Sequence, residues 1–260
     1  MIKTVDLKKH FLIGRHQILH AVDGISLDIA ENEILGLVGE SGSGKSTFGK
    51  TLIGLHERTS GEAYYRGQPL PAKFTAADHS RYSTDLQMIF QDPFASLNPR
   101  LKIEQTLGEP LFIHGLCKTW NEARSKIAAT LERVGMDPKI MSRHPHEFSG
   151  GQRQRIGIAR VMILQPKLVI ADEAVSALDV SIQAQVLNLI KKLQRDSGMS
   201  MLFISHDLGV VRHISDRVAV MLAGKIVEIG DKHQIFEAPQ HEYTRKLLNS
   251  IPRIAIGKEA

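Results

Sequence analysis

The 260-residue sequence contains a single cysteine, Cys117, so no disulfide bond can form within the chain. It also lacks any segment close to the roughly 18 consecutive apolar residues that a membrane-spanning helix needs. Residues 218–224 form one of its longest apolar runs. Charged side chains such as Lys8 and Lys9 stand near the N-terminus, where a signal peptide needs an apolar core. We therefore expect the chain to reside in the reducing cytoplasm and to reach a membrane only through partner proteins.

Dense blocks of positive charge are absent as well. The 33 lysines and arginines exceed the 28 aspartates and glutamates, which gives a net charge of +5 with histidine neutral. The cations are scattered, whereas a nucleic-acid-binding surface is typically marked by clustered ones. We interpret the excess of positively charged residues as part of an ordinary solvent-exposed surface and expect no nucleic-acid partner.

Four short apolar runs predict the buried strands of a sheet. They cover residues 34–38, 86–90, 168–171 and 201–205. Helical periodicity lies between them, most clearly at residues 180–193. Because alternating strands and helices imply crossover connections, we predict an α/β fold with a mostly parallel sheet.

Antiparallel strands are predicted beside this core. Residues 4–10 and 25–29 alternate loosely in polarity, and residues 217–230 have the pattern of a hairpin that turns at Ala223-Gly224. We therefore expect an antiparallel β subdomain that flanks the parallel sheet.

A mostly helical stretch lies between Pro93 and Pro166. Pro138 and Pro145 interrupt it. We predict an inserted α-helical subdomain over roughly residues 93–166. One apolar stripe within it consists of Ala123, Ile127, Leu131 and Val134.

A glycine-rich run directly after residues 34–38 predicts a phosphate-binding loop. Its glycines let backbone N–H groups turn inward, Lys45 can reach the β and γ phosphates, and the Ser46 hydroxyl can ligate Mg²⁺. A helix that begins near Lys45 would add its positive N-terminal end. The expected nucleotide-binding residues are Gly39, Glu40, Ser41, Gly42, Ser43, Gly44, Lys45, Ser46 and Thr47.

Two carboxylates, Asp172 and Glu173, follow the apolar run 168–171. Ligands collect at the carboxyl ends of strands in such sheets. Asp172 is placed to hold Mg²⁺, and Glu173 to orient and polarise a water that attacks the γ-phosphate. Without the phosphate loop, both carboxylates would be explained by the start of a helix. Together with the loop, they predict a P-loop NTPase.

Ser149, Gly150, Gly151 and Gln152 precede an apolar helical pattern at residues 156–164. Alone, this run is explained by a helix cap. Its place between the phosphate loop and the acidic strand makes the chain resemble the nucleotide-binding subunits of ABC transporters. Their signature is Leu-Ser-Gly-Gly-Gln, and Phe148 stands here at the leading position. The resemblance implies a RecA-like core and two domains that sandwich ATP head to tail, each signature contacting the other's γ-phosphate.

The resemblance assigns roles to further residues. Gln91 matches a glutamine that senses Mg²⁺ and the attacking water, and His206 matches a switch histidine that bonds the γ-phosphate. Asp179 matches a loop that communicates across the dimer, or else is a helix N-cap. The family also stacks an aromatic residue on adenine. That position falls near His16, with Phe11 as the other candidate.

Three stretches, residues 90–100, 177–185 and 241–248, look like the ATPases of oligopeptide, dipeptide and nickel importers. This resemblance implies ATP and Mg²⁺ as cofactors, a second homologous ATPase subunit, two membrane permeases and, indirectly, a solute-binding protein. The chain would sit peripherally on the cytoplasmic face of the bacterial inner membrane. We expect an ABC ATPase domain at residues 1–239 and a short helical tail at 240–260. Peptides are the expected cargo.

Other functions remain open at this stage. The end at Ala260 also fits the nickel and antimicrobial-peptide or polyamine branches of the same family. A non-transport ABC protein of translation or DNA repair typically has tandem cassettes or a long coiled-coil insertion, and the sequence has no sustained heptads. A GTPase or small-molecule kinase is the third possibility, although no Asn-Lys-x-Asp guanine motif is present.

Overall fold

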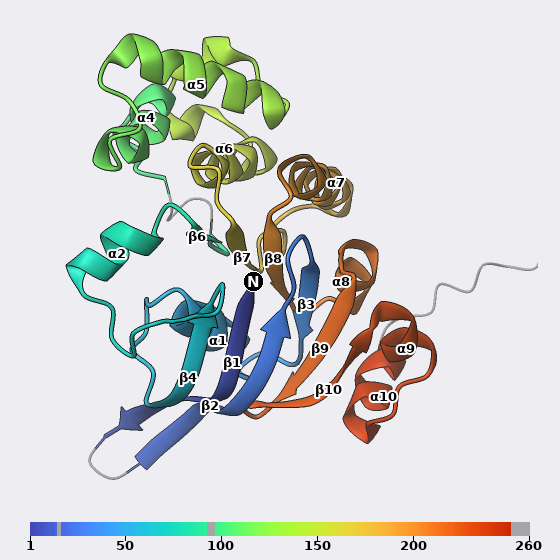
Figure 1. The fold of residues 1–260 in the computed structure, drawn as a ribbon. Helices are drawn as coiled ribbons and strands as arrows, with labels where there is room; N and C mark the ends of the chain where they lie inside the picture. The colour runs from blue at the N-terminus through green and yellow to red at the C-terminus, as the bar shows by residue number, and fades with distance from the viewer. Residues whose placement is uncertain (15–16, 93–96, 251–260) are drawn as a thin grey trace, which may run out of the picture.

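The computed structural model describes residues 1–14, 17–92 and 97–250. Two sheets organise this part of the chain (Figure 1). A six-stranded sheet has the order β10-β9-β3-β8-β7-β6, and a four-stranded sheet has the order β2-β1-β4-β5. None of the helices described has the length and apolar character needed to cross a membrane.

The six-stranded sheet is parallel except for the pair β9 and β10. The four apolar runs each form a strand, as predicted, and the hairpin turns at Ala223-Gly224 as predicted. β6 ends one residue earlier than expected: its pairing with β7 stops at Ile89, and Phe90 is exposed. The strands are β3 Ile34–Val38, β6 Leu86–Ile89, β7 Leu168–Asp172, β8 Ser200–Ser205, β9 Arg217–Leu222 and β10 Lys225–Asp231.

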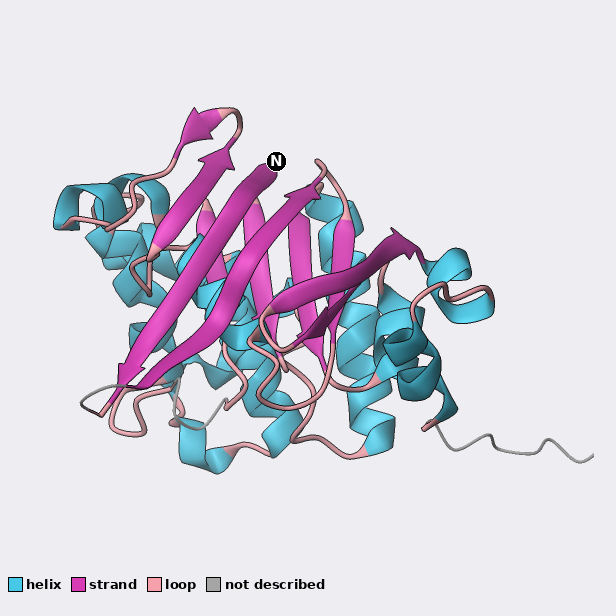
Figure 2. Ribbon diagram, turned by 90° about the horizontal axis from the view of Figure 1, so that it is seen from below, coloured by secondary structure: helices cyan, strands magenta, loops and turns pink. Residues whose placement is uncertain are grey.

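The four-stranded sheet is antiparallel and consists of β1 Ile2–Ile13, β2 Gln17–Ile29, β4 Ser60–Tyr65 and β5 Gln68–Pro69. This confirms the predicted antiparallel portion. Helix α1, Lys45–Leu52, packs with residues of both sheets in one apolar cluster that includes Phe48 and Leu52. Figure 2 shows the long strands crossing in front of the shorter ones, with helices behind and beside them. The phosphate loop therefore starts from a well-buried framework.

Helices fill the chain between β6 and β7, in the upper part of Figure 1. The predicted apolar stripe of Ala123, Ile127, Leu131 and Val134 is fully buried. Pro138 and Pro145 each begin a short 3-10 helix, which confirms the predicted interruptions. Pro93 lies outside the described residues. The elements are α4 Ile103–Ile113, α5 Trp120–Arg133, Pro138–Ser142, Pro145–Glu147 and α6 Gly150–Met162; α2, Ala76–Tyr82, precedes β6.

The other helices described follow β7 in the chain. They are α7 Val180–Ser197, α8 Leu208–Ile214, α9 Lys232–Glu237 and α10 Glu242–Asn249. α7 covers the predicted helix and buries Val186, Ile190 and Leu193. The Glu228 carboxylate on β10 accepts hydrogen bonds from the backbone N–H groups of Gln240 and His241, at 2.7 and 3.0 Å. These bonds hold the start of α10 against the sheet.

Candidate functional site

The phosphate loop joins β3 to α1, and α1 begins at Lys45 as predicted. Its N-cap, Gly44, has a left-handed backbone with φ of 105° and caps the helix with no side-chain hydrogen bond. A Cβ atom at Gly44 would lie 1.9 Å from the carbonyl oxygen of Ala21 on β2, so only glycine fits. The helix N-terminus is thus left open to an anion.

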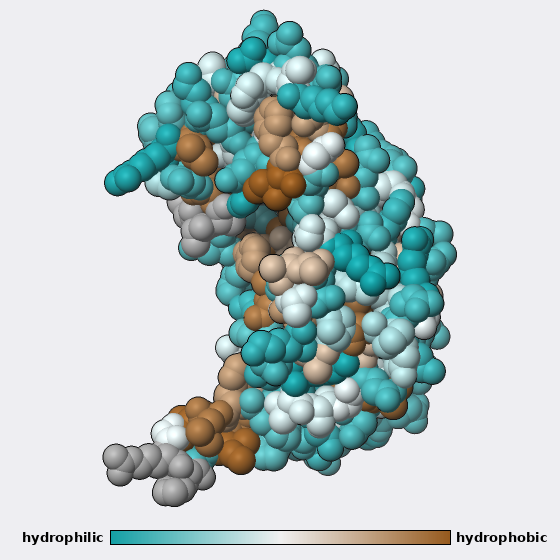
Figure 3. All heavy atoms as spheres, turned by 60° about the vertical axis from the view of Figure 1, so that its left-hand side comes forward, coloured by the Kyte–Doolittle hydropathy of each residue, from teal (hydrophilic) through white to brown (hydrophobic). Residues whose placement is uncertain are grey.

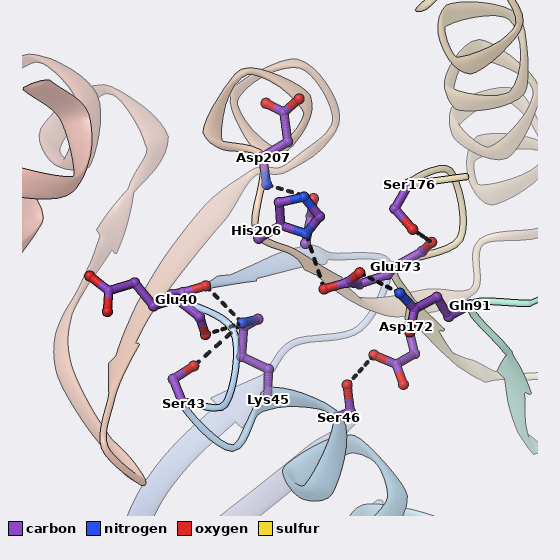
Figure 4. Close-up of polar contacts among 12 residues, drawn as sticks. Glu40, Ser43, Lys45, Ser46, Gln91, Asp172, Glu173, Ser176, His206 and Asp207 are labelled. Carbon is purple, nitrogen blue, oxygen red and sulfur yellow. Dashed lines mark hydrogen bonds and ion pairs between the residues drawn. The ribbon is translucent and has the colours of Figure 1, made fainter. Parts of the chain in front are cut away.

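Lys45 is 4% exposed and lies inside the loop. Its Nζ donates hydrogen bonds to the carbonyl oxygens of Gly39 and Glu40, at 2.7 and 2.8 Å, and more weakly to the Ser43 hydroxyl (Figure 4). Burial lowers the pKa of Lys45, while the nearby carboxylate of Glu173 favours its charged form. The loop's own oxygens therefore hold a buried cation where phosphate oxygens would be bound.

Asp172 ends β7 and accepts a 2.6 Å hydrogen bond from the Ser46 hydroxyl. It is 4% exposed, and burial raises its pKa although the Ser46 bond opposes the shift. A cation beside it would offset the cost of this buried charge. The Ser46 hydroxyl and the Asp172 carboxylate, in contact at 2.6 Å, and the carboxamide of Gln91, whose Nε2 is bonded to Glu173, supply oxygen donors of the kind that Mg²⁺ prefers.

Glu173 has a left-handed backbone with φ of 46°, which is costly for a residue other than glycine. Its backbone N–H donates to the carbonyl of Ile204 at 2.9 Å, which holds it against β8. Gln91 Nε2 donates to one carboxylate oxygen at 2.8 Å, and His206 Nδ1 lies 3.1 Å from the other (Figure 4). The structure thus brings together the three residues predicted to be catalytic, from three different strand ends.

The run Ser149 to Gln152 begins α6 in a different manner. Ser149 Oγ accepts from the Gln152 N–H at 3.4 Å, and Gln152 Oε1 accepts from the Ser149 N–H at 3.0 Å. A Cβ at Gly151 would lie 2.4 Å from Ile182 Cγ2, so glycine permits close packing of α6 on α7. Asp179 is the N-cap residue of α7, without a side-chain cap bond.

A cavity of about 690 Å³ surrounds the phosphate loop. Phe11 lines it, whereas Ser149 to Gln152 and Asp179 do not, and His16 lies outside the described residues. Of the predicted set, Gly39, Glu40 and Ser43 belong to the loop without lining the cavity, and His206 does not line it either but contacts Glu173. The predicted residues that line the cavity are Ser41, Gly42, Gly44, Lys45, Ser46, Thr47, Gln91 and Glu173.

Sequence reasoning missed the other wall of this cavity, which is formed by Leu19, His20 and Ala21 of β2 and by the Ala223-Gly224 turn. The segments meet because the Asp23 N–H donates to the Gly224 carbonyl at 2.8 Å. No local pattern marks these residues. Only the predicted hairpin turn at Ala223-Gly224 was a usable signal.

Comparison with known proteins agrees with this geometry. A family model described as "ABC transporter" matches residues 22–176, and one described as "Oligopeptide/dipeptide transporter, C-terminal region" matches residues 227–260. The putative oligopeptide transport ATP-binding protein YkfD of Bacillus subtilis is 49% identical over 252 residues, which are 97% of this chain and 76% of that protein. The oligopeptide transport ATP-binding protein OppF of Escherichia coli is 49% identical over 264 residues, covering 97% and 78%.

Among solved structures, the dimeric ATP-binding cassette MJ0796 bound to ADP and Pi superposes with a TM-score of 0.80 at 26% identity. The match covers 89% of this chain and 99% of that one. The predicted P-loop NTPase fold is therefore confirmed. The chain belongs to the ABC transporter family and is one of its ATP-binding, ATP-hydrolysing subunits.

Proposed function

We propose that this chain powers an importer that carries oligopeptides or dipeptides across the bacterial inner membrane. The proposal is supported by the match of residues 227–260 to an oligopeptide and dipeptide transporter region and by relatives named for oligopeptide transport. The structural observation that supports ATP hydrolysis is the position of the Glu173 carboxylate, which contacts Gln91 and His206 beside the phosphate loop.

In this proposal, the residues around the phosphate loop divide the steps of ATP hydrolysis among them. Lys45 exchanges its carbonyl partners for the β and γ phosphates, and the open start of α1 adds backbone donors. A carboxylate has about four acceptor sites, so Glu173 can orient and polarise the attacking water while Gln91 and His206 hold it. Ser46, Asp172 and Gln91 would hold Mg²⁺, which would neutralise phosphate charge.

A second homologous ATPase subunit completes the site in this proposal. Ser149 to Gln152 do not line the cavity of their own chain, so any γ-phosphate that they contact belongs to a partner. The dimeric state of the cassette MJ0796 supports such an assembly. We assign residues 1–239 to the ATPase domain and 240–260 to a tail. Phe11, which lines the cavity, is the proposed adenine contact.

The permease contact is proposed at a groove between β6 and the helices above it. Figure 3 shows the molecule hollowed between its upper and lower parts, with apolar side chains beside the hollow. A cavity of about 280 Å³ between β6 and helices α4 and α6 is lined by residues that include Phe90 and Ile113, which are 44% and 71% exposed. Because Phe90 precedes Gln91, a docked permease could move a residue that touches Glu173. In this proposal, a chain docked to its permeases through the groove lies peripherally on the cytoplasmic face of the membrane.

The test uses the complex of this chain with its partner ATPase, permeases and solute-binding protein in proteoliposomes. Glu173→Gln keeps the shape of the side chain and removes its charge. We expect ATP binding to persist and turnover to fall roughly 100-fold or more. Glu57→Gln, at an exposed carboxylate paired with Lys73, is the matched control and should hydrolyse normally. Normal turnover by Glu173→Gln would overturn the proposed mechanism.

The cargo is tested separately in the same vesicles. Peptide uptake is measured beside uptake of Ni²⁺ with the wild-type complex. We expect ATP-dependent accumulation of dipeptides or oligopeptides. Uptake of Ni²⁺ alone would reject peptides as cargo and leave the ATPase mechanism intact.

A further inference from the structure

Three side chains converge on one point of the β1–β2 hairpin, and of these His20 also lines the cavity around the phosphate loop. His10 Nε2 lies 3.3 Å from Asp23 Oδ1, and His20 Nδ1 lies 3.6 Å from the same oxygen. The two imidazole rings have centroids 4.0 Å apart. Within residues 1–14, 17–92 and 97–250, this is the one group of three histidine, cysteine or acidic side chains whose ligand atoms all lie within 4.8 Å.

An irregularity in strand pairing creates this convergence. His10 on β1 pairs with His20, and Lys8 pairs with Asp23, so β2 has one residue more than β1 between these pairs. In a regular strand, residues 20 and 23 would point to opposite faces of the sheet. The bulge turns Asp23 onto the face of both histidines. Bulges commonly serve to re-aim a side chain in this way.

We propose that His10, His20 and Asp23 bind a divalent transition-metal ion of the Zn²⁺ class, separate from the Mg²⁺ of the nucleotide. Two imidazole nitrogens and one carboxylate oxygen are the donors that such ions prefer, whereas Mg²⁺ prefers oxygen alone. Bonds of about 2.0–2.1 Å at tetrahedral angles put neighbouring ligand atoms ~3.3 Å apart. The observed spacings of 3.3 and 3.6 Å to Asp23 Oδ1 match that edge length.

The surroundings are those of an accessible ligand set. The side chains of His10 and Asp23 are 20% and 27% exposed, and that of His20 is 54% exposed. Lys225 Nζ lies 3.5 Å from Asp23 Oδ2, the other carboxylate oxygen. This ion pair orients the carboxylate and leaves Oδ1 toward the histidines. The ammonium of Lys225 is itself largely exposed, so water screens its repulsion of a bound cation.

A bound ion would act on the wall of the nucleotide cavity. His20 lines that cavity, and the carbonyl of Ala21 is the group that leaves no room for a side chain at Gly44. The Asp23 N–H in turn holds Gly224 of the opposite turn. Fixing the bulge therefore fixes residues on two sides of the phosphate loop. The site is a candidate for metal-dependent control of nucleotide access.

Cobalt and zinc binding test the proposal on the full-length, metal-stripped chain without nucleotide. Co²⁺ is titrated in and its visible absorption recorded, and Zn²⁺ affinity is measured by calorimetry. We expect one saturable ion, displaced by Zn²⁺, with a tetrahedral Co²⁺ spectrum. His20→Asn and Asp23→Asn should each weaken binding at least tenfold, and Zn²⁺ should slow amide exchange at residues 17–24 in the wild type alone. Circular dichroism verifies that the variants are folded.

His144→Asn is the matched control, because His144 stacks on His146 at 5.7 Å elsewhere on the chain. Its Zn²⁺ affinity should equal that of the wild type. Equal affinity of the His20 and Asp23 variants and the wild type would overturn the proposal. So would the absence of saturable binding, or a loss confined to His144→Asn.

Discussion

The phosphate loop and the run Ser149 to Gln152 both contain glycines at or beside the start of a helix, yet the two helix starts are capped in opposite ways. α1 starts at a left-handed glycine that offers no side-chain cap, whereas α6 starts with a reciprocal cap between Ser149 and Gln152. The first helix start is open to a ligand. The second satisfies its own backbone groups while the chain is alone. The start of α1 therefore leaves backbone N–H groups free for a phosphate, whereas the start of α6 does so only if its cap opens, which is the state we propose for contact with a partner subunit.

Their glycines differ in the same sense. Gly44 is required by a left-handed backbone and by the carbonyl of Ala21, so it shapes the phosphate loop itself. Gly151 is required by the side chain of Ile182 on α7, so it sets the packing of two helices. Similar sequences at the two helix starts therefore serve different physical needs.

The largest expected effect comes from Lys45→Ala. Loss of a charge-assisted contact to phosphate costs up to about 3 kcal/mol, which is roughly 100-fold in ATP affinity. Binding of a slowly hydrolysed ATP analogue to the single chain, measured by calorimetry, checks this. Ser149→Ala is the comparison variant and should bind as the wild type does, because Ser149 does not line the cavity. Equal losses in both variants would erase the distinction between the two helix starts.

Gly44→Ala should have the next largest effect. The new Cβ would meet the Ala21 carbonyl at 1.9 Å on a left-handed backbone, so the loop must move. We expect a loss of roughly 2–3 kcal/mol in the free energy of unfolding, measured with urea. Gly42→Ala is the matched control, since Gly42 is also left-handed but has no atom within 4 Å of its Cβ. It should cost about 1 kcal/mol; a control that costs as much as Gly44→Ala would show that the Ala21 contact is unimportant.

Much of the parallel core could be predicted from sequence because its determinants are local. Buried parallel strands are continuous apolar runs, and residues 34–38 and 168–171 lie within strands of the structure. The phosphate loop was equally local, since glycine, lysine and serine stand at fixed spacing. Gln91 and His206 were predicted only from the family resemblance; in the structure they meet Glu173 because β6, β7 and β8, whose ends carry them, are neighbours in the sheet.

The far wall of the cavity could not be predicted in this way. His20 and Ala21 reach the phosphate loop through the register of β1 and β2, and that register contains a bulge. A single extra residue in a strand turns following side chains to the other face, and no composition signal marks it here. The left-handed backbone of Glu173 was not predictable either, because no residue type or spacing marks it in the sequence.

Asp172→Asn tests whether the buried carboxylate of Asp172 beside the start of α1 destabilises the folded chain when no cation is bound. Burial raises the pKa of Asp172 above its ordinary value of 3.8, so ionisation at neutral pH destabilises the folded chain. The asparagine keeps an acceptor for Ser46, and we expect the nucleotide-free variant to unfold at higher urea concentration at pH 7. The difference should shrink as the pH falls toward 3.8, where the unfolded carboxyl takes up its proton.

Asp78→Asn should respond with the opposite sign. Hydrogen bonds from the Thr75 side chain and backbone lower the pKa of Asp78, so its ionised form stabilises the folded chain above the ordinary carboxyl pKa. That variant should be less stable than the wild type at pH 7. If both substitutions destabilise, Asp172 does not carry an uncompensated charge.

The smallest expected effect is at the join between the C-terminal region and the phosphate loop. Tyr243 on α10 accepts a 3.2 Å hydrogen bond from the Glu40 N–H, and burial raises the pKa of Tyr243, so its hydroxyl stays neutral. Tyr243→Phe should weaken ATP binding by about 0.5–1 kcal/mol, or two- to fivefold. Tyr64→Phe removes a hydroxyl bonded to Glu62 on β4 and should leave affinity unchanged. A drop in ATP affinity confined to Tyr243→Phe would mean that the phosphate loop depends on a helix more than 200 residues away in sequence. The start of α6, in contrast, is capped by its own residues Ser149 and Gln152. Equal affinities would mean that both helix starts are set locally.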